Sequence, residues 1–289
     1  MALKSLLLAA SCAEDDAAVF NAAAALARRF NAHVEAIPAF SDPAADYVSY
    51  GAAMRPADAR TLERVREAEA SEMALLQRLA KDATERQGLT VGGGADIVVR
   101  ERALQPAVAL ARASVLTDLV LFGAASVRKG AALGALFAET LLMTRAPSLL
   151  VGAGAPAFEH IAIAWDGSAQ AGRAVRAAMP LLEAAKQVVV LTNVDEAPSG
   201  EQSPMAEPLL AHLARHGAPR AETRAIHGAD VAASLLGAAA AANCDTLVVG
   251  AYGRPRLYEL VLGGTTRALV HAGNAPHLLM AHLRFRQWT

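Results

Sequence analysis

Continuous apolar runs alternate along the chain with longer segments in which apolar residues recur every three or four positions. The pattern is clearest in the C-terminal part, where it predicts strands at about 160–165, 187–194, 219–226, 244–250 and 276–282, and helices at 169–185, 228–242 and 264–272. A run such as VVVLTNV (188–194) is typical of a strand that is buried on both faces of a parallel sheet. The alternation therefore predicts an α/β fold with a doubly wound sheet of five parallel strands.

The same order of elements occurs twice. Three pairs of segments correspond: LKSLLLAAS (3–11) with HIAIAWDGS (160–168), TDLVLFGAAS (117–126) with CDTLVVGAYG (244–253), and RAPSLLVGA (145–153) with NAPHLLMAH (274–282). A repeat this long indicates two tandem domains rather than a solenoid of short units. We place the domains at 1–153 and 158–289, with the boundary in the small-residue segment GAGAPAFE (152–159).

Two further features of the pattern concern helix length and assembly. In the first copy, the charged segment 57–87 keeps a helical spacing of its apolar residues and predicts one long helix. The two copies are expected to pair near their fifth strands, around 147–152 and 276–282, because a covered sheet edge leaves no unpaired N–H and C=O groups. The two domains would then pair within one chain. Whether two chains also form a homodimer is left open by the sequence.

Composition and charge narrow the classes of function. Hydrophobic residues make up 54% of the chain and charged residues 19%, as in a folded protein with a large core. The net charge of −1 argues against nucleic acid as a partner. The apolar run Leu6–Ala10 is shorter than the roughly 7–15 residues of a signal peptide core, and charges interrupt the alanine-rich stretches, so we expect no membrane segment. Two isolated cysteines, Cys12 and Cys244, indicate reduced thiols and a cytoplasmic protein.

A glycine-rich stretch, GAYGRPRLYELVLGGTTRAL (250–269), comes at the end of the predicted strand 244–250. Glycine permits positive φ and a close approach of the backbone to a ligand, and a helix N-terminus offers free N–H groups to an anion. Thr265 adds a hydroxyl group and Arg254 a positive charge. The spacing matches neither a P-loop nor a dinucleotide fingerprint, so the residues alone leave a phosphate site and a plain tight turn equally open.

The motif in this stretch resembles that of the universal stress protein family. Nucleotide-binding members of the family carry G-x2-G-x9-G-[ST] after the fourth strand, and Gly250, Gly253 and Gly263 stand at that spacing. The aspartate that ends the family's first strand is matched by Asp166 in AWDGS. The valine that holds adenine through its backbone is matched by Val194 in LTNVDE. The resemblance covers the whole chain as two tandem copies, strongly in the second and weakly in the first.

The resemblance implies ATP or a related adenine nucleotide as the ligand, which Mg²⁺ can accompany. It also implies a role in stress survival. The implied binding residues are Asp166, Gly167, Ser168, Val194, Gly250, Gly253, Arg254, Gly263, Gly264 and Thr265. Gly264 replaces the family's Ser/Thr after the last glycine, so this position offers an amide without the hydroxyl group. We therefore expect modest affinity.

The first copy departs further from the family motif. Ser11, Ser126 and Leu136 stand where the second copy has aspartate, glycine and glycine, and a leucine side chain would crowd the phosphate path. We therefore expect one nucleotide per chain, bound within 160–289 only. Ser11 and Glu14 also have the spacing of a capping box, which predicts a helix start in this segment.

Other polar residues give weaker signals. His212 and His216 are four apart on a predicted helix, but no third metal ligand is near in sequence, so a solvated or capping pair is favoured. His227 follows the third strand of the second copy, within reach of a ribose or phosphate, and Ser168 is expected to cap the helix at 169. The lack of a placed general base disfavours a slow nucleotide hydrolase. The aspartate, valine and glycine motif disfavours a purely structural adaptor.

Overall fold

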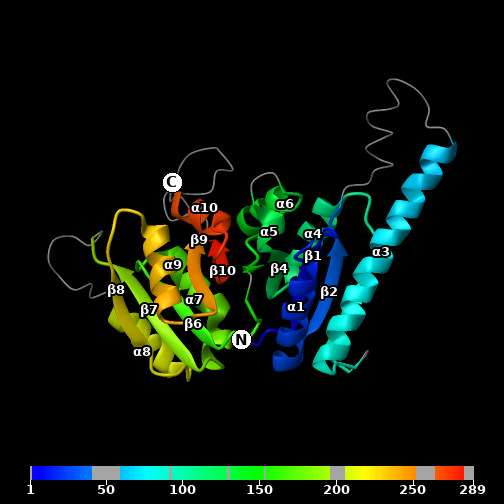
Figure 1. The fold of residues 1–289 in the computed structure, drawn as a ribbon. Coiled ribbons are helices and arrows are strands. Elements are labelled where there is room, and N and C mark those ends of the chain that lie inside the picture. Colours follow the sequence, from blue (N-terminus) through cyan, green and yellow to red (C-terminus); the bar gives the residue numbers. More distant parts are fainter. Residues whose placement is uncertain are drawn as a thin grey trace, which may run out of the picture.

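The structure is a computed structural model that describes residues 2–40, 59–90, 93–128, 131–152, 154–195, 206–251 and 264–282. Strands and helices alternate along the chain (Figure 1). The N-terminal half contains β1 (Ser5–Ala10), α1 (Asp16–Phe30), β2 (His33–Pro38), α3 (Ala59–Gln87), β3 (Asp96–Val99), α4 (Pro106–Ala113), η1 (Ser114–Leu116), β4 (Leu119–Gly123), α5 (Ala124–Val127), α6 (Gly134–Glu139), η2 (Thr140–Thr144) and β5 (Ser148–Val151). The C-terminal half contains β6 (His160–Ala164), α7 (Ala169–Glu183), β7 (Gln187–Asn193), α8 (Ala206–Arg215), β8 (Glu222–Ile226), α9 (Val231–Ala241), β9 (Thr246–Ala251), α10 (Gly264–His271) and β10 (His277–His282).

The ten strands of the described residues form one sheet in the order β3-β2-β1-β4-β5-β10-β9-β6-β7-β8. Neighbouring strands within each half are parallel, as the continuous apolar runs predicted. The halves meet at one antiparallel pair, β5 with β10, where Leu150 lies opposite Leu278. The two copies thus pair through their fifth strands, as expected from the sequence. The domain limits at 153 and 158 remain predictions, because one continuous sheet spans both halves.

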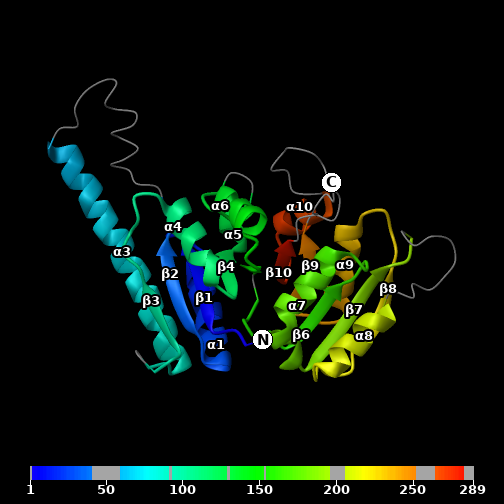
Figure 2. The same cartoon turned by 180° about the vertical axis from the view of Figure 1, so that it is seen from behind.

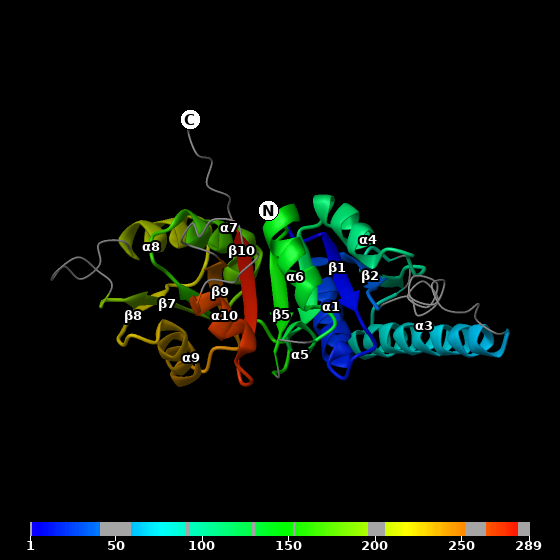
Figure 3. The same ribbon diagram turned by 90° about the horizontal axis from the view of Figure 1, so that it is seen from above.

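Helices cover both faces of the sheet, and each face has its own hydrophobic core (Figure 3). Helices α1, α3, α7 and α8 contribute to one core, and α4, α6, α9 and α10 to the other. The alternation of side chains along a strand explains the division. In β1, Leu6 and Leu8 enter the first core, whereas Leu7 and Ala9 enter the second. Burial on both faces is the reason that the strands read as continuous apolar runs.

Two arginines of the N-terminal half reach across the junction to helix ends of the C-terminal half. The Arg29 guanidinium donates to the carbonyl oxygen of Ala184, at the end of α7, and to the carbonyls of Ala157 and Phe158. Arg128 donates to the carbonyl of Gly273, just beyond α10, at 3.3 Å. A cation at a helix C-terminus is favourable because the last carbonyls carry partial negative charge. Hydrogen bonds from these two guanidinium groups therefore add to the contact that the antiparallel strand pair makes between the halves.

His277 fastens the segment that links the halves to β10. The ring is fully buried, its Nδ1 accepts a hydrogen bond from the Gly152 amide at 3.1 Å, and Nε2 lies 3.2 Å from the Ala155 carbonyl oxygen. An amide donor at Nδ1 requires that Nε2 carries the proton, which it donates to Ala155. Burial lowers the pKa of His277, which is consistent with this neutral ring.

The long charged helix predicted at 57–87 is α3, which spans Ala59–Gln87. It packs on α1 through its C-terminal part, where Leu76, Ala80 and Ala83 are buried, and its first turns extend past the body of the molecule (Figures 1 and 2). Among the described residues, no helix combines the length and apolarity needed to cross a membrane.

Candidate functional site

The candidate residues gather where the chain reverses the order of its strands. In the C-terminal half β6 lies between β9 and β7, so the connection leaves on one side of β6 and later returns on the other. Ligands of doubly wound sheets bind outside the carboxyl ends of the strands at such a point. Asp166 follows β6, Val194 follows β7, and Gly250 is the second-last residue of β9. The strand order therefore brings these three positions, far apart in sequence, to one edge.

Asp166, Gly167 and Ser168 form a tight turn from β6 into α7. The Asp166 Oδ1 accepts a hydrogen bond from the Ser168 amide at 2.9 Å, and Gly167 has a φ of 73°. The Ser168 hydroxyl accepts from the Ala171 amide at 3.1 Å, so Ser168 caps α7 as predicted. Asp166 is exposed, and its second carboxylate oxygen accepts no hydrogen bond from the described residues. The turn thus presents one carboxylate oxygen to solvent at the edge of the sheet.

Gly250 is the point of closest approach between β9 and α7. A Cβ atom at Gly250 would lie 2.5 Å from the backbone nitrogen of Ala171 and 2.7 Å from the carbonyl carbon of Gln170. These are main-chain atoms of a helix and cannot turn away as a side chain can. The absence of a side chain at Gly250 is therefore required by packing, independently of any ligand.

Helix α10 begins with the small residues Gly264 and Thr265, both exposed. Among the described residues, a Cβ atom at Gly264 would meet nothing within 4 Å. The amides of the first turn of a helix have no acceptor within the helix, so they are available to an anion. Three predicted residues, Gly253, Arg254 and Gly263, lie outside the described residues.

One of the two main-chain polar groups of Val194 is used within the sheet. Its amide donates to the carbonyl oxygen of Ile226 at 3.2 Å, which extends the β7–β8 ladder by one bond. Its carbonyl oxygen accepts no hydrogen bond from the described residues. Of the two main-chain groups, the carbonyl is therefore the one available to a base.

A hydrogen-bonded group that the sequence analysis did not anticipate lies beside Val194. Asp195 Oδ1 is 3.1 Å from Nδ1 of His227, and its Oδ2 accepts from the Gly228 amide at 2.7 Å. The Ser234 hydroxyl in turn donates to the His227 carbonyl. The Gly228 amide, and then His227, lower the pKa of the Asp195 carboxyl. Strand adjacency was the available signal, because Asp195 and His227 closely follow the neighbouring strands β7 and β8.

The matching edge of the N-terminal half is filled by the protein itself. Asp15 Oδ2 accepts hydrogen bonds from the amides of Ala125 and Ser126, at 2.9 and 3.1 Å, and its Oδ1 from the Ser126 hydroxyl at 2.5 Å. A Cβ atom at Gly123 would collide with this carboxylate. The amides that open α5 are therefore already bound to a negative charge.

Strand register and helix bounds give the counterparts of Gly123 and Asp15. Leu8 pairs with Leu121 and Ile163 with Val248, so Gly123 and Gly250 correspond. Asp15 is the N-cap residue of α1, and the uncharged Ser168 is the N-cap residue of the equally long α7. The two copies thus differ by one negative charge at equivalent positions.

The capping box predicted at Ser11 and Glu14 is wrong. Helix α1 begins at Asp16, its N-cap residue is Asp15 without a side-chain cap bond, and the Ser11 hydroxyl is buried with no hydrogen-bond partner. The fully buried Asp16 carboxylate instead accepts from the amides of Ser11 and Cys12 through Oδ2, while Oδ1 has no partner. Burial raises the pKa of Asp16 from 3.8 to about 6, and the charge of Asp15 adds to the rise.

Leu136, expected to crowd the phosphate path of this half, lies inside α6 and is partly buried against the core, because the helix of this half already begins at Gly134.

The rings of His212, on α8, and His216, just beyond its end, contact each other at a tilt of 53°, with 4.5 Å between their centroids. Burial lowers the pKa of His212, and the neighbouring His216 lowers it further. Within the described ranges, no group of three or more His, Cys, Asp or Glu side chains could hold a metal ion.

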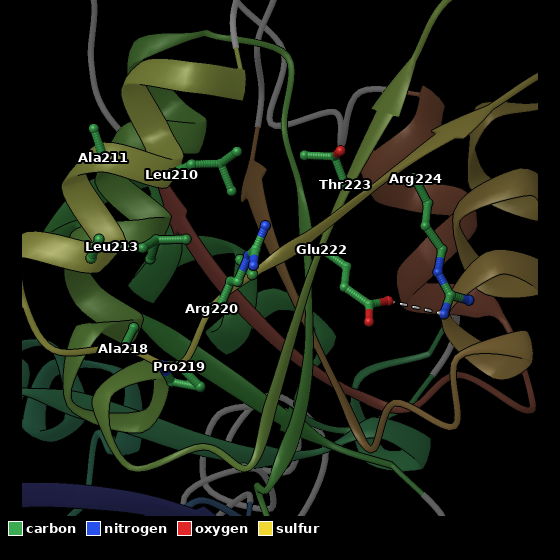
Figure 4. A pocket seen from close by; sticks show the side chains of 11 residues that line it. Leu210, Ala211, Leu213, Ala218, Pro219, Arg220, Glu222, Thr223 and Arg224 are labelled. Atoms are coloured by element: carbon green, nitrogen blue, oxygen red, sulfur yellow. Dashed lines mark hydrogen bonds and ion pairs between the residues drawn. The ribbon is translucent and has the colours of Figure 1, made fainter.

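A groove of about 1180 Å³ lies between α8 and the first part of the edge strand β8, away from the turns that hold Asp166 and Val194 (Figure 4). Leucines and alanines of α8 line one side, and Arg220 and Glu222 lie on the other. Glu222 and Arg224 form a 3.5 Å ion pair at the rim. The groove shares no residue with the edge that holds Asp166 and Val194.

Comparisons with known proteins agree with this architecture. Residues 157–280 match the model of the universal stress protein family. The chain is similar to the crystal structure of a universal stress protein from Archaeoglobus fulgidus, with a TM-score of 0.70 and 14% identity over 98% of this chain and 99% of that chain. It is also similar to a protein of unknown function from Pseudomonas aeruginosa, with a TM-score of 0.57 and 14% identity over 97% and 93% of the two chains. No curated protein matches.

The fold therefore defines a doubly wound α/β protein in two copies, a class of fold whose ligands bind at the carboxyl ends of the strands. The C-terminal half, through residues 157–280, is similar to the universal stress protein family. The chain's likeness to the Archaeoglobus protein extends over both halves, so the N-terminal half has the same fold.

Proposed function

We propose that the chain binds an adenine nucleotide, ATP or a close relative, at the carboxyl edge of its C-terminal half. It would act in the cytoplasm as a stress-response module whose state depends on that nucleotide. One observation carries the proposal. At the equivalent edge of the N-terminal half the Asp15 carboxylate accepts hydrogen bonds from the amides of Ala125 and Ser126, whereas the C-terminal half has the uncharged Ser168 in place of Asp15, and the first residues of its α10, Gly264 and Thr265, are exposed.

The residues of this edge suit the parts of a nucleotide. The exposed oxygen of Asp166 can accept from a ribose hydroxyl, and the carbonyl of Val194 can accept from the amino group of adenine. The amides of Gly264 and Thr265 can donate to phosphate oxygens at the start of α10. Mg²⁺, where present, would neutralise further phosphate charge. Gly253, Arg254 and Gly263 keep the phosphate-binding roles that the family resemblance gives them.

Calorimetric titration of the full chain with ATP and with AMP tests the proposal. We expect one site per chain, weakened by Asp166→Ala and abolished by Gly253→Val, which places a side chain in the phosphate path. Ser11 is the N-terminal counterpart of Asp166, so Ser11→Ala is the matched control and should leave binding unchanged.

Three outcomes would contradict the proposal in different ways. Two equivalent sites per chain would refute the asymmetry. Undiminished binding in Gly253→Val would remove the glycine motif from the site. No binding of either nucleotide would favour the alternative of a structural adaptor, and release of phosphate during the titration would favour a slow hydrolase.

A further inference from the structure

The strand order sets the direction in which a bound nucleotide must lie. Its phosphates belong at β9 and α10, and Asp166 and Val194 follow β6 and β7 in turn. Neighbouring strands are about 4.8 Å apart, so β8 lies about 14 Å from β9 along this edge. A ligand that runs from β9 over β6 to β7 therefore directs its base toward the turn after β8. His227 is the first residue of that turn.

The partners of Asp195 determine which nitrogen of His227 carries the proton. A carboxylate can only accept hydrogen bonds, so the 3.1 Å contact between Asp195 Oδ1 and His227 Nδ1 requires a proton on Nδ1. In the neutral ring, Nε2 is then an acceptor. The His227 side chain is 68% exposed, which leaves Nε2 accessible to a ligand.

The same contacts hold the ring in place. Asp195 is itself fixed by the Gly228 amide at 2.7 Å, and the Ser234 hydroxyl donates to the His227 carbonyl at 2.6 Å. Gly228 has a φ of 118°, a conformation that suits glycine, so the turn has a defined shape. The turn after β8 is thus tied to the residue that follows Val194.

We propose that His227, oriented by Asp195, reads position 6 of a bound purine. Nε2 accepts one hydrogen of the adenine amino group, while the Val194 carbonyl can accept the other. A 6-oxo purine such as hypoxanthine places a carbonyl oxygen opposite Nε2, so two acceptors face each other without a proton between them. His227 is therefore a specificity-determining residue, and Asp195 is a positioning residue that acts through it.

The inference rests on the proposed function, and Asp195→Asn separates it from a merely structural role. The Gly228 amide is an obligatory donor, so the oxygen of an asparagine must face it. The NH₂ group then faces Nδ1 of His227 and forces the proton onto Nε2. This variant turns the acceptor into a donor without removing the imidazole, and it should favour a 6-oxo base.

The experiment measures AMP and IMP dissociation constants by calorimetry for the full chain and its variants. The original chain should bind AMP about three- to tenfold more tightly than IMP, the effect of one neutral hydrogen bond. His227→Ala should lower that preference severalfold, because only the Val194 carbonyl then distinguishes the bases, and Asp195→Asn should lower it further, because a donor then faces the 6-oxo group. His216→Ala, at an exposed histidine just after α8, is the control and should change neither constant.

Each result decides between the two proposals. AMP binding that depends on Asp166, with an AMP-to-IMP ratio unchanged by His227→Ala, overturns this inference and leaves the proposed function standing. Binding of neither nucleotide to the original chain overturns both. Unfolding midpoints in urea equal to that of the original chain show that a changed ratio comes from the site and not from a loss of folding.

Discussion

The turns that follow β4 and β9 share a plan, and the residues packed against them differ. Each has a glycine, Gly123 or Gly250, beneath the start of the helix that follows the half's first strand. In the N-terminal half the closest neighbour of the glycine is a carboxylate, which also binds the amides of the turn. In the C-terminal half the closest neighbour is the helix backbone of Gln170 and Ala171. A shared glycine therefore does not indicate a shared ligand, because the neighbouring side chain decides what the amides bind.

The largest expected effect tests the packing side of this comparison. Gly250→Ala should lower the free energy of unfolding by about 3 kcal/mol, because the new Cβ meets main-chain atoms of α7 at 2.5 Å. Gly123→Ala should cost less, about 2 kcal/mol, since the Asp15 side chain can turn aside but then gives up its hydrogen bonds to Ala125 and Ser126. Urea unfolding followed by circular dichroism measures both. Equal losses would show that the two glycines have the same role.

Asp16 gives the N-terminal half a dependence on pH. Its pKa is about 6 in the folded protein against 3.8 unfolded, so the folded state binds the proton more tightly. Its contribution to stability is fully present below about pH 3.8 and is lost as the pH rises through about 6. The cost of ionisation above pH 6 is then up to about 3 kcal/mol.

Asp16→Asn should remove this cost, because the amide oxygen can still accept from Ser11 and Cys12 while no charge is buried. The variant should be more stable than the original chain at pH 7.5 and similar to it at pH 4. Unfolding measured in urea at several pH values checks this. A variant less stable at pH 7.5 would contradict the assignment.

Asp15→Ala should cost about 2 kcal/mol, since two amides and a hydroxyl group lose a charged acceptor. Nucleotide binding in the other half should keep its affinity and its single site. Asp166→Ala is the informative counterpart: it should weaken nucleotide binding and change stability by about 0.5 kcal/mol or less, because Asp166 is exposed. Reversal of these two patterns would exchange the roles of the halves.

The smallest expected effect sharpens the account of the open half. A serine at Gly264 restores the hydroxyl group of the family motif, and no described residue comes within 4 Å of a Cβ atom there. Gly264→Ser should tighten nucleotide binding by about 1 kcal/mol, a several-fold change, with stability almost unchanged. Weaker binding in calorimetry would show that the loop holds its ligand differently from the family pattern.

The sequence was sufficient for the fold because the fold depends on patterns repeated over many residues. The predicted strands at 160–165, 187–194 and 276–282 lie within one residue of the observed bounds at each end. The helix cap at Ser168 was also local, and it is confirmed.

Contacts between distant residues were not predictable in this way. Asp15 bonds to residues 110 and 111 positions away, and Asp195 bonds to His227, 32 positions away. The capping box failed for a related reason: the buried carboxylate of Asp16 takes the amides of Ser11 and Cys12. Local spacing cannot show which of several nearby carboxylates accepts a given amide hydrogen in the folded protein.

The antiparallel pair of β5 and β10 has a consequence for how the two halves can change. Between separate identical chains, such a contact would depend on concentration, and every substitution would appear on both sides of it. Here one polypeptide carries both partners, so dilution cannot separate them, and the effective concentration is set by the connection between them. Each half can also acquire substitutions alone. Asp15 at the helix N-cap of one copy and Ser168 at that of the other is a difference that a symmetric dimer of one gene product could not contain.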